Sequence, residues 1–265
     1  MAVRPIAIAM AALDFRRTRL YVRAPLSAGA EIDLDRGQAN YLVNVLRLKD
    51  GDGILVFNGR DGEWTARLLA EGRKAWLLSV GVLVRPQPAA ADLHYLFAPL
   101  KHARLDYMVE KAVEMGVGRL RPVLTRHGQV ARVNRARMEA NAIEAAEQCG
   151  ILSIPVIDEP VALDGLIARW TEAEGRRRIV FCDEDHGGAD PLSVLAELAP
   201  GPLAVLVGPE GGFAEEERRL LRTQPFVTAI PLGPRILRAD TAAVAALALV
   251  QAAIGDWQST APAPH

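Results

Sequence analysis

The chain has 265 residues, of which 50% are hydrophobic and 24% are charged. This composition is typical of a globular protein and excludes a disordered chain, and no apolar run reaches the roughly 18 residues that a membrane-spanning helix needs. The net charge of −1 argues against a nucleic-acid partner, but residues 1–86 carry +4 and residues 87–265 carry −5, so the basic amino-terminal part keeps RNA binding open.

Residues 1–85 are expected to form a short extension followed by a β-rich domain. The extension covers residues 1–14, and a secretory signal is the alternative interpretation of its short apolar run. Within residues 15–85, strand-like runs separated by glycine-containing turns lie at 20–22, 53–57, 63–68 and 75–84. Apolar residues at helical spacing predict a short helix over 38–48. This pattern predicts a small β-barrel.

A linker rich in alanine and proline at 86–91 separates that domain from a second pattern. Strands are predicted at 93–100, 120–124, 155–157, 178–182, 203–207 and 229–232. Helices are predicted at 105–115, 135–149, 163–173, 215–221 and 241–254. Strands that alternate with helices predict a mainly parallel α/β sheet in residues 92–258, followed by a tail at 259–265.

The cysteines predict a reducing compartment and no metal site. Only Cys149 and Cys182 are present, which excludes a disulfide framework and favours the cytoplasm. Cys182 and His186 offer two metal ligands with no second pair nearby, so we expect a buried thiol and a surface histidine instead. We expect no metal and no membrane partner.

Two loops carry the candidate chemistry. The first, Val207–Phe213, has glycines at 208, 211 and 212 after an apolar strand, an arrangement that permits close backbone approach to a ligand. A tight turn between strand and helix is the alternative. The spacing fits neither a Walker A loop nor a dinucleotide-binding fingerprint. The second loop, Leu232–Ala242, joins the next strand to the last helix, with Asp240 or Thr241 as candidate helix caps.

Together the motifs Gly-Pro-Glu-Gly-Gly-Phe and Leu-Gly-x-Arg-Ile-Leu-Arg-x-Asp-Thr-Ala resemble those of the SPOUT class of RNA methyltransferases, and more closely those of the RsmE family. That family methylates N3 of a uridine in 16S ribosomal RNA. The resemblance spans nearly the whole chain, since residues 16–22 and 41–52 resemble the PUA-like RNA-binding domain of the family. Residues 110–117 and 144–148 resemble helices of its catalytic domain. This chain has Asp240 where the family has Glu, and Arg126-His127-Gly128 where an Arg-Ser pair is frequent.

The resemblance implies a SPOUT-type knotted parallel sheet, with a trefoil knot near the carboxyl end, behind a PUA-like barrel. It also implies S-adenosylmethionine (SAM) as the cofactor, a homodimer, and 16S rRNA of the small ribosomal subunit as the partner. The loop after residues 181–182 would form a third wall of the cofactor site. The cofactor-binding positions carried over are Val207, Gly208, Glu210, Gly211, Gly212, Leu232, Gly233, Ile236, Leu237, Arg238, Thr241 and Ala242.

Uridine N3 carries an imide proton, so the enzyme must orient the base, stabilise the developing anion and accept the proton. Arg238 is the candidate for orienting or stabilising the uracil carbonyls, and a structural salt bridge is its alternative role. Glu210 or Asp240 is the candidate proton acceptor, and hydrogen bonding to the loop backbone is the alternative for both.

Arginines are the candidates for RNA contact. No acid occurs between Glu114 and Glu139, where six arginines stand at 119, 121, 126, 132, 135 and 137, so this stretch is either a phosphate-contacting strip or a solvated face. The candidate RNA-binding residues are Arg16, Arg17, Arg19, Arg23, Arg47, Arg126 and Arg132. Two other functions stay open: a SPOUT enzyme acting elsewhere on RNA, such as on ribose 2′-O, and a catalytically silent RNA-binding assembly factor.

Overall fold

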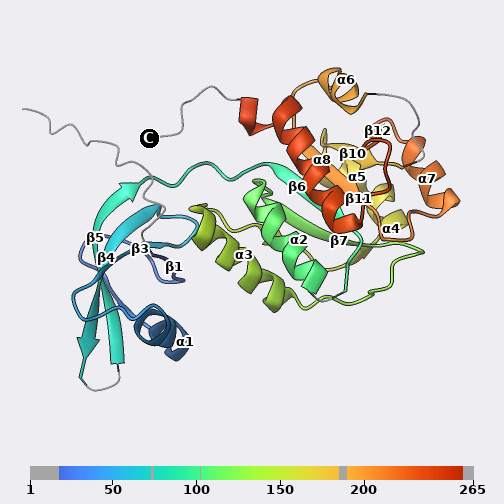
Figure 1. Ribbon diagram of the computed structural model, residues 1–265. Helices are drawn as coiled ribbons and strands as arrows, with labels where there is room; N and C mark the ends of the chain where they lie inside the picture. Colours follow the sequence, from blue (N-terminus) through green and yellow to red (C-terminus); the bar gives the residue numbers. More distant parts are fainter. Residues whose placement is uncertain (1–17, 73–74, 102, 185–189, 259–265) are drawn as a thin grey trace, which may run out of the picture. The chain divides into compact units, whose positions relative to one another are not determined.

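The chain divides into two compact units. The computed structural model describes residues 18–72, 75–101, 103–184 and 190–258 (Figure 1). Unit 1 comprises residues 1–89, 146–153 and 261–265, and unit 2 comprises residues 90–145 and 154–260. The expected extension at 1–14, Arg16, Arg17, His186 and the tail at 259–265 lie outside the described residues.

Within its described residues, unit 1 contains a five-stranded sheet in the order β1-β3-β4-β5-β2. The strands are β1 (Arg19–Tyr21), β2 (Glu31–Asp33), β3 (Gly53–Phe57), β4 (Glu63–Glu71) and β5 (Ala75–Arg85). β1 pairs with β3 in parallel and the other pairings are antiparallel. The four predicted strands are confirmed. β2 was not predicted, because a three-residue strand with one buried side chain, Ile32, has too short a pattern to recognise.

The helix of unit 1 begins at Arg36 rather than at Gln38. α1 (Arg36–Asn40) is capped by Asp35, whose carboxylate accepts a hydrogen bond from the Gln38 amide at 2.8 Å, while the Gln38 side chain accepts one from the Asp35 amide. The pair forms a capping box, which fixes the first turn. The helix continues as a π-helical turn, η1 (Tyr41–Val45), whose Leu42 is fully buried in the core of unit 1.

Unit 2 is built on a parallel sheet, as predicted. Its described strands run in the order β12-β10-β11-β6-β7-β8, and β9 pairs with β7. Every pairing in this sheet is parallel. The strands are β6 (Leu93–Phe97), β7 (Arg119–Leu124), β8 (Val156–Ile157), β9 (Val161–Ala162), β10 (Arg178–Cys182), β11 (Leu203–Val207) and β12 (Val227–Ile230). β11 is buried along its whole length, which explains its unbroken apolar run.

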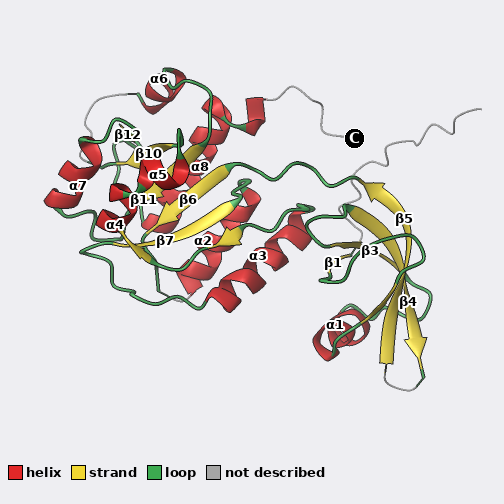
Figure 2. Cartoon of the chain, turned by 180° about the vertical axis from the view of Figure 1, so that it is seen from behind, coloured by secondary structure: helices red, strands yellow, loops and turns green. Residues whose placement is uncertain are grey.

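Helices cover both faces of this sheet (Figures 1 and 2). α2 (Ala103–Glu114) and α8 (Ala239–Ile254) pack together on one face. α4 (Leu163–Ala168) and α5 (Trp170–Glu174) lie on the other, where Leu166 and Trp170 pack against the strands. The remaining helices are α3 (Arg135–Cys149), α6 (Pro191–Ala196), α7 (Glu215–Arg222) and the short η2 (Asp256–Gln258). In the described residues, no helix is both long and apolar enough to cross a bilayer.

Several bounds in unit 2 differ from the prediction. The strand predicted at 93–100 ends at Phe97, and β9 was not predicted. The predicted helix 163–173 is interrupted at Arg169, whose backbone leaves the helical region. The edge strand β12 spans 227–230 rather than 229–232, because its pairing with β10 joins Val227 to Ile179 and Ile230 to Cys182. α6 was not predicted, although Asp190 caps it and Pro191 opens it, a typical helix start.

Candidate cofactor cavity and RNA-facing loops

Three strand ends meet at one cavity of about 610 Å³ in unit 2. β10 leads into Asp183 and Glu184, β11 leads into the glycine loop 207–213, and β12 leads into the loop 231–237. The carboxyl edge of a parallel α/β sheet is the usual place for a ligand, and the volume suits a small-molecule cofactor. The remaining lining residues are Asp190, Pro191, Arg218, Ala239 and Ala242.

Two glycines of the first loop have no room for a side chain. A Cβ on Gly208 would lie 2.5 Å from the ring of Phe213, which is buried edge-on against Phe181. Gly212 has a φ of +68°, and a Cβ there would lie 2.6 Å from Glu184 Oε1. A Cβ on Gly211 would meet only the His127 side chain, at 3.4 Å. Gly208 and Gly212 are therefore required by the fold of the loop, and Gly211 is not.

A buried carboxylate anchors α7 beneath the loop. Asp183, whose side chain is 1% exposed, accepts two hydrogen bonds from Arg222 at 2.6 and 2.8 Å, and lies 3.7 Å from Arg218. Arg218 also donates to Glu184 at 2.8 Å. Sequence reasoning did not single out Asp183, Glu184 or Arg218. The available signal was the position of Asp183 directly after a buried strand. Asp183 and Glu184 line the cavity, while a third wall of a cofactor site after residues 181–182 stays a prediction.

The second loop ends at the exposed Arg238. Arg238 is the N-cap position of α8, where its carbonyl accepts from the Ala242 amide at 2.7 Å, so the expectation that Asp240 or Thr241 caps this helix is wrong. Asp240 lies in the first turn and accepts from the Thr241 amide at 3.0 Å. Among the described residues, none forms an ion pair with the Arg238 guanidinium. The alternative role of a structural salt bridge thus has no support in the described part of the chain.

The cavity brings together most of the predicted cofactor positions. Its lining includes Val207, Gly208, Glu210, Gly212, Leu232, Gly233, Ile236, Leu237 and Ala242. Gly211, Arg238 and Thr241 are exposed neighbours outside the lining. Ile236 is 92% exposed, an unusual position for an isoleucine side chain. Glu210 is 33% exposed and lies 3.5 Å from Arg104 of α2.

Comparison with known proteins identifies the family. Residues 87–251 match the profile described as an RNA methyltransferase domain, and residues 34–80 match one described as an RNA methyltransferase PUA domain. The chain belongs to the RNA methyltransferase family. The matched residues include both loops of the cavity.

Individual relatives agree with this family. The chain is 29% identical to the Ribosomal RNA small subunit methyltransferase E of Rickettsia conorii over 88% of its own length and 94% of that protein. It is similar to a Legionella pneumophila protein described as a methyltransferase and solved with SAM, with 29% identity, a TM-score of 0.78, and coverage of 91% of this chain and 99% of the other. The SAM-bound Ribosomal RNA small subunit methyltransferase E of Neisseria gonorrhoeae has 25% identity, a TM-score of 0.77 and the same coverage.

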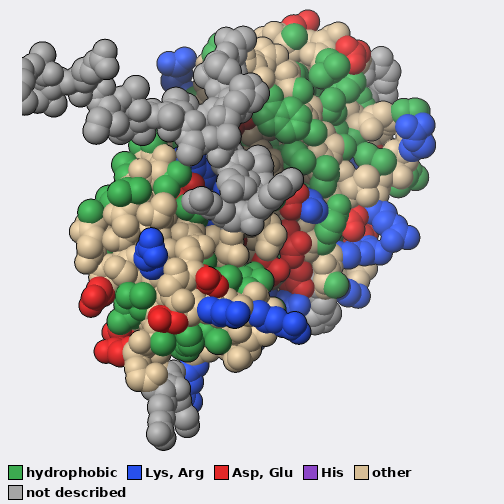
Figure 3. Space-filling view, turned by 60° about the vertical axis from the view of Figure 1, so that its left-hand side comes forward, with side chains coloured by type: hydrophobic (Ala, Val, Ile, Leu, Met, Phe, Trp, Pro, Cys, Tyr) green, Lys and Arg blue, Asp and Glu red, His purple; other side chains and the backbone are tan. Residues whose placement is uncertain are grey.

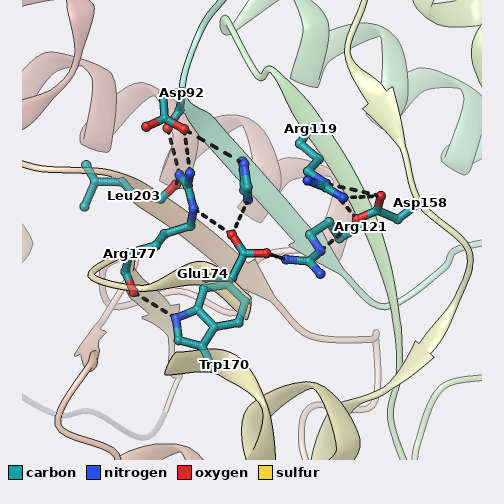
Figure 4. A network of polar contacts seen from close by, with 9 residues as sticks. Asp92, Arg119, Arg121, Asp158, Trp170, Glu174, Arg177 and Leu203 are labelled. Atoms are coloured by element: carbon teal, nitrogen blue, oxygen red, sulfur yellow. Dashed lines mark hydrogen bonds and ion pairs between the residues drawn. The ribbon is translucent and has the colours of Figure 1, made fainter. Parts of the chain in front are cut away.

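Most arginines of the acid-free stretch of this methyltransferase are held by acids from elsewhere in unit 2. Asp158 accepts hydrogen bonds from Arg119 and forms an ion pair with Arg121, which also pairs with Glu174 (Figure 4). Arg135 pairs with Glu159, and Arg137 pairs with Asp106 at 2.5 Å. These pairs favour the solvated-face alternative over a phosphate-contacting strip at these four arginines, because acids from distant parts of the chain neutralise them in space. On the face in Figure 3, Lys and Arg side chains likewise lie among Asp and Glu side chains.

Two exposed arginines of the stretch are not held by a close acid. The Arg126 side chain is 70% exposed, with its nearest acid oxygen, on Glu216, 4.0 Å away. Arg132 is exposed and has no ion-pair partner among the described residues. In unit 1, Arg23 and Arg47 are exposed.

The structure contradicts the prediction that Arg19 contacts RNA. Its side chain is 2% exposed, and its Nε donates to Glu63 Oε1 at 2.9 Å in the interior of unit 1. Arg85 donates to the same carboxylate at 2.8 Å. A guanidinium buried in this way is not available to an RNA phosphate, so Arg19 supports the fold of unit 1.

The thiol nearest the cavity is inert. Burial, followed by the charge of Asp183, raises the pKa of Cys182 to about 12, so the thiol stays protonated at neutral pH.

Asp190, in the cavity lining, has a lowered pKa because its carboxylate accepts hydrogen bonds from the Ser193 hydroxyl and amide and from the Leu192 amide. Among the described residues, no group of three or more His, Cys, Asp or Glu side chains is arranged to hold a metal ion.

Proposed function

We propose that this protein is a SAM-dependent methyltransferase that methylates N3 of a specific uridine in 16S ribosomal RNA of the small subunit. The observation that carries the proposal is the cavity itself, where the glycine loop and the 231–237 loop meet at the carboxyl edge of the sheet. Relatives that align with about nine-tenths of the chain support it, because two of them were solved with bound SAM and two are named as small-subunit rRNA methyltransferases.

The chain's own residues fit SAM. Gly208 and Gly212 present backbone without a side chain to the cavity lining. Carboxylates from three segments, Glu184, Asp190 and Glu210, line the cavity and suit a ligand that carries ammonium and sulfonium charges. We propose that the backbone of the two loops holds the cofactor and that all twelve predicted cofactor positions contribute to its binding. When bound, SAM supplies an electrophilic methyl group.

Catalysis in this proposal depends on orientation and charge. Arg238 directs its exposed guanidinium to the uracil carbonyls and stabilises the anion that forms when N3 loses its proton. Glu210 is our candidate proton acceptor, supported by its place in the lining, and Arg104 holds its carboxylate in position. Asp240 is less suited to this role, since its carboxylate already accepts the Thr241 amide.

We propose that residues 15–85 form the PUA-like barrel, 86–91 a linker, and 92–258 the SPOUT domain with its trefoil knot. The division of the chain between residues 89 and 90 supports this organisation. Arg23 and Arg47 from the barrel, with Arg126 and Arg132, are the proposed RNA contacts. Arg16 and Arg17 stay predictions. We further propose a cytoplasmic homodimer that needs no metal.

The test is mass spectrometry of nucleosides from 16S rRNA of a strain lacking the gene. We expect N3-methyluridine to be absent and to return with the wild-type gene but not with Arg238→Ala. Calorimetry with SAM accompanies it and tests cofactor binding by the wild-type chain. Retained N3-methyluridine would refute the assignment, and absence of SAM binding would favour a silent assembly factor.

A further inference from the structure

The loop after β7 is fastened to the glycine loop by one glutamate. Glu217 Oε1 accepts a hydrogen bond from the Arg126 amide at 2.8 Å, and Glu217 Oε2 accepts one from the Ala214 amide at 2.9 Å. A third contact joins His127 Nδ1 to the Gly211 carbonyl at 3.3 Å. Arg126 and Glu217 are 91 positions apart in the sequence, and both lie in unit 2.

The position of Glu217 at the start of α7 explains only half of this arrangement. Acidic residues favour a helix amino terminus, and Glu215, Glu216 and Glu217 all lie in the first turn. The helix end needs one carboxylate oxygen to satisfy the Ala214 amide. Glu215 and Glu216 are exposed, whereas Glu217 is half-buried and uses its second oxygen on a different loop.

That second loop carries the arginine best placed to meet a phosphate beside the cavity. Four other arginines of the same stretch are held by nearby acids. Arg126 keeps an exposed side chain, and its pairing with Glu216 at 4.0 Å is weak enough to be replaced by a phosphate. Its backbone amide, in contrast, is fixed by Glu217.

We propose that Glu217 is a positioning residue for substrate RNA: it clamps the loop 125–128 to the cofactor loop, so that the Arg126 guanidinium faces the RNA backbone next to the site of methyl transfer. The role of Arg126 rests on the proposed function. The clamp itself rests on the two hydrogen bonds of the carboxylate. It makes Glu217 a determinant of RNA affinity without contact to RNA.

The test uses Glu217→Gln in the full-length chain, with Glu215→Gln as the matched control. Glutamine has the shape of glutamate but one acceptor oxygen, so it can no longer accept from both amides in the present arrangement. We expect it to keep the Ala214 amide of its own helix turn and to release that of Arg126. Amide hydrogen exchange should accelerate at Arg126 in Glu217→Gln only. The KM for RNA should rise about threefold to tenfold, the effect of one lost hydrogen bond, while kcat and the Kd for SAM change less than about twofold.

A double-mutant cycle with Arg126→Ala separates positioning from general stability. If Glu217 acts through Arg126, adding Glu217→Gln to Arg126→Ala should leave the KM for RNA nearly unchanged. The proposal is overturned if the Kd for SAM rises by the same factor as the KM, or if the full effect persists without the Arg126 side chain. If the wild-type chain methylates no RNA, the proposed function fails. The clamp is tested separately, because unchanged amide hydrogen exchange at Arg126 in Glu217→Gln would overturn it whatever the protein methylates.

Discussion

Single atoms decide which glycines of the glycine loop 207–213 are replaceable. Gly208 faces a buried aromatic ring and Gly212 combines a positive φ with a close carboxylate, whereas Gly211 faces open space beside His127. Glycines that cannot be distinguished in the sequence therefore have different structural roles. Protein neighbours explain two of the three glycines, while the close backbone approach to a ligand that their spacing suggested stays a prediction.

Gly208→Ala and Gly211→Ala form a matched pair that tests this distinction. The new methyl group at 208 must displace the Phe213 ring from 2.5 Å, and such overpacking costs about 1–3 kcal/mol. At 211 the methyl group meets the His127 side chain at ordinary contact distance, so we expect a change within about 0.5 kcal/mol. Urea unfolding measures both. Equal destabilisation of the two variants would show that the ring does not limit the loop.

At the scale of elements, burial separates two acids that bind the same arginine of α7. Asp183 is 1% exposed and Glu184 is 54% exposed, yet both pair with Arg218. Removing the charge of Asp183 leaves Arg218 and Arg222 without their buried partner. The pair with Glu184 contributes less, because water already solvates the Glu184 carboxylate.

We therefore expect Asp183→Asn to lower the free energy of unfolding by about 2–3 kcal/mol, and Glu184→Gln by less than about 1 kcal/mol. Thermal and urea unfolding monitored by circular dichroism provide the comparison. The two substitutions are equally conservative, so the contrast isolates burial. If Glu184→Gln is the more destabilising change, the anchor of α7 lies at the rim of the cavity and not beneath it.

Local patterns predicted elements well and missed contacts between distant segments. The strands at 53–57, 178–182 and 203–207 and the helix at 135–149 match their predicted bounds, because each has a clear period or a clear glycine stop. Nine cavity-lining residues follow from two motifs. Charge neutralisation did not follow: Asp158 and Glu63 sit far along the chain from the arginines they bind, and only the folded chain brings them together.

At the scale of the whole molecule, unit 2 has two charged regions at opposite ends of its sheet. The cavity lies at the carboxyl ends of the strands, and a network of arginines and acids lies around the amino ends of β6, β7 and β10 (Figure 4). His94 is buried within this network, 3.5 Å from Glu174 and 4.0 Å from Asp92. Burial, followed by the charge of Arg177, lowers the pKa of His94 to about 4.

Because of His94, the free energy of unfolding should depend on pH well above the pH range in which the Asp and Glu side chains titrate. The folded state keeps His94 neutral, whereas the unfolded chain takes up a proton below about pH 6.5, so stability falls as the pH falls through that value. Between about pH 7.5 and about pH 5, the expected loss in the free energy of unfolding is about 2 kcal/mol, and it levels off only near the folded pKa.

The variant His94→Gln has no group at this position that titrates, so its free energy of unfolding should fall by about 2 kcal/mol less over the same interval. Urea unfolding at stepped pH measures the two slopes. Parallel slopes for wild type and variant would show that folding leaves the pKa of His94 unchanged, with Glu174 and Asp92 offsetting burial and the charges of the neighbouring arginines.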